Sequence, residues 1–547
     1  MKILDNPFYI LKCMPESTKS TIHEQAEEKS FDLDENICKN AESILINPKK
    51  RLEAEISWFP GLELAIVSER IKSLITNPQK YVSDLIIYKT KNYLAEANLL
   101  TFGLESAKNI SEWTKDDIRL AASFLCTFCE NISIEDSVNK IVLSREKSKF
   151  PTNILEEDAA LYIDEQKKYY EKTLYDFFQK IDSDSVIEIL TKMVRESTRS
   201  GSCRCKWYLL ENIIAKYEID LSDFIDEEKT VILKDVEILT DYIVSKKENN
   251  LDEMYYKLEK DLEYWKSVVY PIMVIKTSRG LNDDNSENLF YTIRKLMLIS
   301  ANNYGNYHFS LRLTKLCKNI FAELRSIQEC MEEDDQTLSS LVQKADDEAR
   351  EKKEFMEFSC VFGSVFKTSV KTDEKEITIN GTDVYKYEDI EKFKWGRTVN
   401  NAILDTFNMT IEFVTKNRKA PVKLTLDSEI VFERLKEILW RGAGILILRK
   451  YLNELKKGRT ISIGSTTIYD YGIELKEDAF IFSSIKMFAW KDIKYSLING
   501  SVLELKGPDG YQISLDLNKE YNVFAFYVLL NRFAQDGNGI RLSSVYE

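Results

Sequence analysis

The cysteines form the first pattern that could do chemistry, because two closely spaced thiolates can hold a metal or exchange a disulfide. Cys126 and Cys129 have C-x-x-C spacing, and Cys203 and Cys205 could supply two more sulfur ligands. A zinc ribbon needs two C-x-x-C pairs on turns, whereas Cys126 follows an apolar run of helical type and the second pair is C-x-C. We therefore expect Cys126 and Cys129 to be core thiols, and no metal or cofactor is predicted.

The two histidines of the chain, His23 and His308, limit the enzymes that it could be. His23-Glu24 begins like the helix of a zinc protease, but Glu27 stands where that motif has its second histidine. The sequence contains no G-x-S-x-G nucleophile motif and no G-x-x-x-x-G-K-S/T phosphate loop. Gly442-x-Gly444 lacks a preceding strand and a third glycine. With no recognisable catalytic motif, we expect a noncatalytic protein.

The composition describes an acidic globular chain of several domains. The 547 residues carry a formal net charge of -14, which disfavours binding to nucleic acid. No apolar run reaches the roughly 18 to 20 residues of a membrane helix. The nine cysteines are scattered, as in proteins with reduced thiols. We expect a cytoplasmic location.

Residues 6–61 carry the motifs that say most about function. The segment opens with Asn6-Pro7-Phe8-Tyr9-Ile10-Leu11. Thr18 and Thr21 are N-cap candidates for a first helix, and Asp34 is one for a second helix that runs into Asn47-Pro48. The sequence therefore predicts a small helical hairpin.

This hairpin resembles a J domain, the co-chaperone module of the DnaJ family. Asn6–Leu11 stands where that family has D/N-P/Y-x-x-x-L, and Ala41–Arg51 matches its A-x-x-x-L-x-D/N-P-x-K-R ending. The resemblance implies a heat-shock chaperone as partner and a J-like core. The core residues would be Phe8, Leu11, Ala41, Leu45 and Pro48.

The His-Pro-Asp tripeptide that triggers ATP hydrolysis in the chaperone partner of J domains is missing from this hairpin. The corresponding loop reads Ser30-Phe31-Asp32-Leu33-Asp34, and neither histidine precedes a proline. The first long helix, expected at Lys19–Lys29, is not basic, although J domains meet the chaperone with positive surface there. We therefore predict a degenerate J-like domain at residues 1–61 that is a docking module.

Four residues of this segment are candidates for partner binding: Lys49, Lys50, Arg51 and Trp58. The basic cluster Lys49–Arg51 has two readings. It could complement the dipole at a helix C-terminus, which is worth about 0.3 to 1 kcal/mol, or it could dock an acidic partner. Trp58, just past a helix and next to Phe59, needs an apolar surface to contact, which the body of the protein could also supply.

Residues 62–354 are predicted to be all-helical and similar to a helical solenoid. Helices at Leu289–Ser300 and Leu311–Gln328 should form an antiparallel pair joined by Asn302–Asn306. The stretch Glu332–Glu354 is expected to be a solvated connector helix, with an acidic docking tail as the alternative. No repeat period is evident, so the type of solenoid stays open.

The sequence repeats itself after Phe358, in the same order throughout. The matching stretches are Phe362–Ser364 with Ile463–Ser465, Tyr387–Ile390 with Trp490–Ile493, and Val422–Asp427 with Tyr511–Asp516. Each copy has short alternating strands and then one amphipathic helix, at Ser428–Trp440 and at Lys519–Phe533. We predict two domains, at 358–442 and 458–547, with a helical bridge at 443–457 after Arg441-Gly442-Ala443-Gly444 ends the first helix.

Strands closed by a single helix resemble a pleckstrin-homology-like (PH-like) β-barrel or sandwich, of the kind found in bacterial members of that group. The resemblance implies lipid or protein binding. Lys367, Lys371 and Lys375 could hold a phosphoinositide, but Asp373, Glu374 and Glu376 lie among them, so protein contact is favoured.

The sequence as a whole predicts a multidomain α+β protein. The expected function is that of a noncatalytic adaptor or scaffold that binds partner proteins. The alternatives are a divergent J-domain co-chaperone and a peripheral membrane protein that binds lipid through its PH-like domains.

Overall fold

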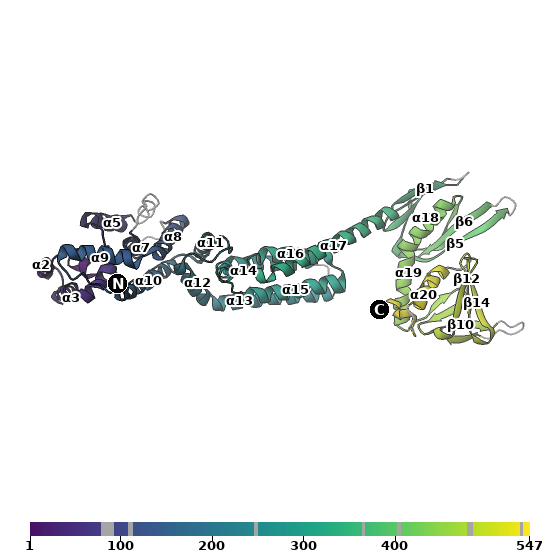
Figure 1. The fold of residues 1–547 in the computed structure, drawn as a ribbon. Coiled ribbons are helices and arrows are strands. Elements are labelled where there is room, and N and C mark those ends of the chain that lie inside the picture. Colours follow the sequence, from purple (N-terminus) through teal and green to yellow (C-terminus); the bar gives the residue numbers. More distant parts are fainter. Residues whose placement is uncertain are drawn as a thin grey trace. The chain divides into compact units, whose positions relative to one another are not determined.

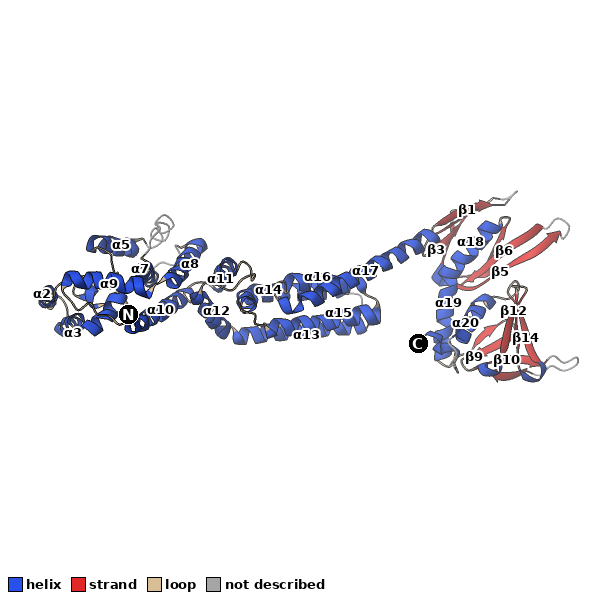
Figure 2. Ribbon diagram, in the orientation of Figure 1, coloured by secondary structure: helices blue, strands red, loops and turns tan. Residues whose placement is uncertain are grey.

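The computed structural model describes residues 1–77, 92–107, 113–245, 250–363, 367–401, 406–477, 485–535 and 540–546. The chain divides into two compact units, Met1–Val342 and Gln343–Glu547. Unit 1 is helical, and the strands belong to unit 2, so the predicted α+β class is confirmed (Figures 1 and 2).

The N-terminal segment of unit 1 contains the predicted hairpin. Its helices are α1 (Pro7–Ile10), α2 (Lys19–Lys29), α3 (Glu35–Ile46), α4 (Pro48–Ile56) and α5 (Leu64–Thr76). The Thr18 side chain accepts a hydrogen bond from the backbone N–H of Thr21, and that of Asp34 accepts one from Asn36, so Thr18 and Asp34 are N-caps as expected. Asn47 then ends α3 and caps α4.

Eleven further helices are described, and the last of them, α17, begins in unit 1 and continues into unit 2. They are α7 (Tyr93–Ser106), α8 (Lys115–Asn131), α9 (Ile134–Ser148), α10 (Glu156–Phe178), α11 (Ser183–Thr198), α12 (Tyr208–Asp220), α13 (Ser222–Val244), α14 (Leu251–Ser278), α15 (Asp284–Tyr304), α16 (Tyr307–Ile320) and α17 (Arg325–Met356). Buried residues of the hairpin and of most of these helices belong to the same hydrophobic core, and Ile141 of α9 packs in a smaller cluster with Leu52 and Ile56 of α4. The predicted boundary at residue 61 is therefore not a boundary of the core.

The predicted helix pair after residue 288 is present as α15 and α16. Gly305 ends α15 in the left-handed conformation, with φ of 66°. The second helix is shorter than expected, because a turn at residues 321–324 separates α16 from α17. Most of Glu332–Glu354 is exposed on α17, as expected for a solvated helix, and Met356 at its end is buried in the core of unit 2.

The first repeat of unit 2 contains two antiparallel sheets and a helix. The strands β1 (Phe358–Phe362), β2 (Thr368–Thr372), β3 (Glu376–Ile379) and β4 (Asp383–Lys386) pair in this order. After the 3₁₀ turn η2 (Tyr387–Asp389), β5 (Ile390–Asn401), β6 (Thr406–Thr415) and β7 (Arg418–Leu426) form the second sheet, followed by α18 (Glu429–Leu439). The described strands form no closed barrel, because η2 turns the chain away before β5 and no pairing joins β4 to β5.

The second repeat has the same order of elements. Its strands are β8 (Ile461–Ile463), β9 (Thr466–Tyr469), β10 (Gly472–Glu477), β11 (Ile485–Ala489), β12 (Lys494–Ile498), β13 (Val502–Lys506) and β14 (Tyr511–Asp516). They form one sheet in the order β12-β13-β14-β10-β9-β8, with β11 on β10. The turn η4 (Trp490–Asp492) and helix α20 (Val523–Gln535) correspond to η2 and α18. Two of the three matched sequence pairs therefore lie at matching positions of the fold, and Ser364 of the third lies outside the described residues.

The helix after β7 does not end at Arg441–Gly444, so that prediction is wrong. A π-helical turn, η3 (Trp440–Gly444), continues directly into α19 (Ile445–Lys456). A Cβ on Gly442 would lie 2.7 Å from the ring of Tyr387, and one on Gly444 would overlap the ring of Trp440. The glycines therefore allow the close packing that this π-helical turn requires.

The two repeats share one core and are not independent. The ring centroids of Phe393 and Trp395 of the first repeat are 5.0 Å apart, and Phe524 of the second lies 4.9 Å from Trp395 and 5.1 Å from Trp440. Asn522, which precedes α20, hydrogen-bonds to β5 and α19. The repeats therefore form a single packed body within unit 2.

Candidate functional site

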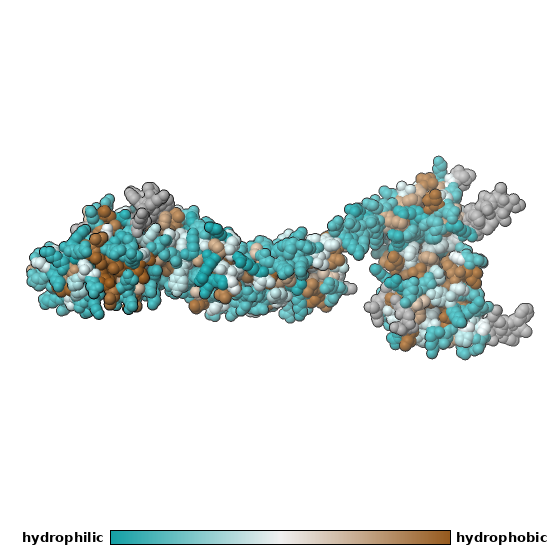
Figure 3. All heavy atoms as spheres, viewed as in Figure 1, coloured by the Kyte–Doolittle hydropathy of each residue, from teal (hydrophilic) through white to brown (hydrophobic). Residues whose placement is uncertain are grey.

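A groove of about 1030 Å³ opens on the N-terminal segment of unit 1, between α1, α3 and α5. Its buried floor consists of Phe8, Cys13, Met14, Trp58 and Val67. Exposed apolar side chains border it. They are Leu4, Tyr9, Leu33 and Ile37. Figure 3 shows apolar residues at the surface of this part of the chain. We call this feature the N-terminal groove.

Trp58 gives the floor of the N-terminal groove a hydrogen-bond donor. Its side chain is 3% exposed, and its Nε1 has no hydrogen-bond partner among the described residues. The indole ring packs on Phe8 and Phe59, with centroid distances of 5.9 and 4.8 Å. A buried donor without an acceptor costs about 1 to 3 kcal/mol.

The groove is uncharged at its floor, and its charged lining residues are the lysines Lys12, Lys29 and Lys72 and the aspartates Asp5 and Asp32. Burial raises the pKa of the Cys13 thiol to about 11, so this floor residue is neutral at physiological pH. At the rim, Lys29 pairs with Asp32 at 3.7 Å. Within the described ranges, Lys12 and Lys72 form no ion pair. The groove therefore suits an apolar segment flanked by carboxylates.

The loop Ser30–Asp34 beside the groove exposes apolar residues. The side chain of Phe31 is 90% exposed, and Leu33 is 44% exposed. Sequence reasoning missed the groove, although Phe31, Leu33 and Ile37 were visible as apolar residues in an otherwise polar hairpin. Exposed apolar residues that cluster in this way are typical of interaction sites.

Arg51 does not lie at the surface, so its prediction as a partner-binding residue is wrong. Its side chain is 0% exposed, and its Nε donates to Glu55 Oε1 at 2.7 Å. Glu55 Oε2 accepts from Arg145 Nη2 at 2.7 Å, which ties α4 to α9. Arg51 also lies over the ring of Phe150, 3.8 Å from its centroid. Arg51 is thus part of a buried ion-pair network that holds the hairpin on the helical body.

The other candidate residues separate into core and surface. Phe8, Leu11, Ala41 and Leu45 are at most 2% exposed and form core, as the resemblance implied. The core prediction is wrong for Pro48, which is exposed as the first residue of α4.

The exposed Lys49 and Lys50 lie in the first turn of α4, not at a helix C-terminus. Their charges therefore do not complement the helix dipole. They do not line the N-terminal groove. Trp58 does line it.

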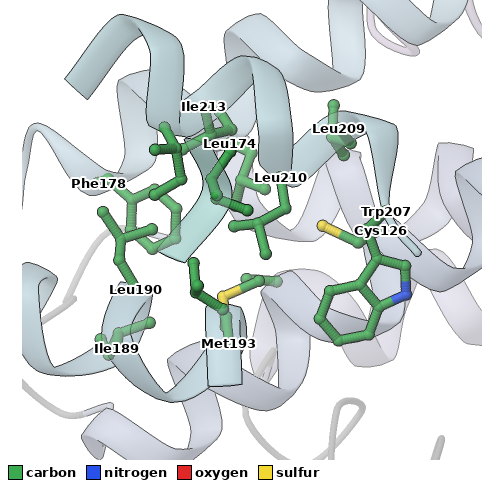
Figure 4. Close-up of a cluster of buried hydrophobic side chains, with 14 of the residues drawn as sticks. Cys126, Leu174, Phe178, Ile189, Leu190, Met193, Trp207, Leu209, Leu210 and Ile213 are labelled. Atoms are coloured by element: carbon green, nitrogen blue, oxygen red, sulfur yellow. The ribbon is translucent and has the colours of Figure 1, made fainter. Parts of the chain in front are cut away.

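Cys126 and Cys129 are core thiols, as predicted. Cys126 is fully buried in the cluster that Figure 4 shows with Met193 and Trp207. Burial raises the pKa of Cys126 well above its usual value and that of Cys129 to about 12. In the part of the chain that is described, no three His, Cys, Asp or Glu residues are arranged to hold a metal.

A second buried polar feature is a pair of carboxyl groups, Asp235 on α13 and Asp261 on α14. Asp235 accepts a hydrogen bond from Lys257, and the Oδ2 atoms of both aspartates are buried without a donor in the described structure. A proton on Asp261 would supply that donor. Burial, followed by the hydrogen bond and charge of Asp235, raises the pKa of Asp261, which Lys257 opposes and Glu228 reinforces.

We expect the variant Asp261→Asn to raise the unfolding temperature of the chain at neutral pH. The folded pKa of Asp261 exceeds its unfolded value, so its stabilising protonated form is lost as pH rises through the folded pKa. The amide of asparagine can donate to Asp235 at every pH. Thermal unfolding at neutral pH and near pH 4 measures this, and the difference should shrink at the lower pH. Asp241→Asn changes an exposed residue of α13, and an equal rise in unfolding temperature for that variant would contradict the prediction.

Comparisons with protein-family models, curated proteins and solved structures find no match for this chain. The likenesses to J domains and PH-like domains therefore remain predictions. Among the described residues, no helix is both long and apolar enough to cross a membrane.

Proposed function

We propose that this protein is a noncatalytic adaptor that binds a partner protein through its N-terminal groove. The exposed apolar border of the groove carries this proposal, because Leu4, Tyr9, Leu33 and Ile37 cluster around a buried apolar floor, and exposed apolar residues that cluster are typical of interaction sites. The J-like hairpin supports the exposed loop of the groove. The repeats of unit 2 are the expected PH-like domains, which their shared order of seven strands, with a 3₁₀ turn after the fourth, and one following helix supports.

The occupant that we propose is an amphipathic helix of the partner. The groove volume of about 1030 Å³ lies at the upper end of small-molecule sites, and its apolar walls suit a helix that lays one face into a groove. Carboxylates on the flanks of that helix would pair with Lys12 and Lys72 at the rim. The side chains that fill the floor would be aliphatic.

The variant Ile37→Glu is expected to weaken binding of such a helix by about tenfold or more, because it places an unpaired charge in the apolar wall. The probe is a fluorescein-labelled peptide with leucines on one helical face and glutamates on its flanks. Fluorescence anisotropy with the full chain measures its affinity. Leu161→Glu, an exposed apolar position on α10 outside the groove, is the matched control and should bind like the wild type.

Equal affinity of Ile37→Glu and wild type would contradict the groove as the site, as would absence of binding by the wild type. The divergent co-chaperone is the alternative. If the chain stimulated the ATPase of a heat-shock chaperone, the adaptor function would be overturned.

A further inference from the structure

Unit 2 contains a second cleft, of about 820 Å³, on its first repeat. It lies between the β2–β3 turn, the turn η2 and the helix that runs from η3 into α19. Five cations line it: Lys352, Lys375, Lys386, Arg441 and Arg449. On a chain with a net charge of -14, such a concentration of positive charge is unexpected for a surface without a role.

Most of these cations are available to a ligand. Arg441 pairs with Glu437 at 2.7 Å and stacks on Phe355. The other four form no ion pair within the described ranges, and all four are exposed. Three carboxylates also line the cleft, those of Glu374, Glu376 and Glu388. The lining residues carry an excess of two positive charges, five minus three, which falls to one because Arg441 is paired with Glu437.

The π-helical turn helps to give the cleft its shape. Gly442 lies against the ring of Tyr387, which brings η2, and Lys386 before it, next to the helix. Beyond the turn, Ile445 and Arg449 are four residues apart and so lie on one face of α19. Ile445 and Leu446 are 38% and 39% exposed and give the cleft an apolar wall between its cations.

We propose that this cleft binds an acidic peptide segment of a partner protein, independently of the N-terminal groove. Carboxylates of the peptide would pair with Lys375, Lys386 and Arg449, and an aliphatic side chain would pack on Ile445 and Leu446. An anionic membrane fits less well. The cations line a concave cleft, and the glutamates among them would repel a uniformly negative surface.

The test uses the full chain and a short fluorescein-labelled peptide of alternating glutamate and valine, which forms no helical apolar stripe. We expect saturable binding by fluorescence anisotropy that weakens as salt rises. The double variant Lys386→Glu/Arg449→Glu should weaken it by about tenfold or more, because attraction becomes repulsion. Lys494→Glu, an exposed charge reversal on β12 outside the cleft, and Ile37→Glu should both bind like the wild type.

Circular dichroism on heating shows whether the double variant keeps its fold. No binding by the wild type, or equal binding by wild type and double variant, would overturn the proposal. The proposal would also be overturned if a peptide with lysine in place of glutamate bound as tightly as the glutamate peptide. A final experiment, cosedimentation with phosphatidylserine vesicles, tests whether the cleft binds an anionic membrane. If vesicles bind in place of the peptide and the double variant loses them, the cleft is a membrane site and the proposal is wrong.

Discussion

Replacing Glu55 by alanine is expected to lower the free energy of unfolding of unit 1 by about 3 to 5 kcal/mol. Glu55 is 1% exposed and is the carboxylate between two buried guanidinium groups. It accepts from Arg51 Nε at 2.7 Å and from Arg145 Nε at 2.9 Å. The backbone carbonyls of Leu45 and Pro15 accept hydrogen bonds from Nη1 and Nη2 of Arg51, but carbonyls do not neutralise its charge. Without Glu55, both cations would remain buried without a counter-ion.

Urea unfolding followed by circular dichroism measures this change, and hydrogen exchange by mass spectrometry should locate the loss at α4 and α9. Lys39→Ala removes an exposed ion pair with Glu35 on the same hairpin and should change little. If Glu55→Ala were as mild as Lys39→Ala, the network would not hold the hairpin on the body.

The second large effect is expected from Asn522→Ala, which should destabilise unit 2 by about 2 to 4 kcal/mol. Asn522 is 3% exposed and has φ of 63°, a conformation that asparagine tolerates better than alanine. Its Oδ1 accepts from the backbone N–H of Phe393 at 3.0 Å. Its Nδ2 donates to Glu391 O at 3.0 Å and to Tyr451 Oη at 2.7 Å. Alanine would leave these two groups of β5 and the Tyr451 hydroxyl of α19 without these partners.

Differential scanning calorimetry and hydrogen exchange at β5 and α20 test this effect. Asn522→Asp buries a carboxylate and sets one of its oxygens against the carbonyl oxygen of Glu391, so its effect should be at least as large as that of alanine. Asn453→Ala, an exposed change on α19, should leave both readouts unchanged. Faster exchange in β5 for Asn453→Ala as well would show that the effect does not come from the contact between repeats.

Local patterns predicted much of the fold. Thr18 and Asp34 signal helix starts through side-chain caps that need only neighbouring residues, and the order of strands in the repeats follows from alternation and turns. Packing between distant segments was not predictable in this way. The contact of Asn522 with Phe393 spans 129 residues. Nothing near either residue in the sequence indicates it.

In the candidate site, too, properties of single residues were predictable and contacts with distant segments were not. Trp58 was identified correctly as a residue that needs an apolar surface, because a tryptophan carries a large apolar area wherever it lies. Arg51 was misplaced, since an arginine next to two lysines looks solvated. Its burial depends on Glu55 and on Phe150, of which the latter is 99 residues away in the chain.

The π-helical turn at Trp440–Gly444 also constrains how the chain between the repeats can change in length. A π-helical turn holds one residue more than an α-helical turn, and each residue of an α-helix rotates the chain by about 100°. A deletion of one residue here would restore a regular helix and leave the side chains of α19 close to their present orientation, because four α-helical residues turn the chain by about as much as the five of the π-helical turn. Ile447 and Leu448, now buried, would then stay in the core. The π-helical turn thus absorbs one extra residue between the repeats while it preserves the phase of α19.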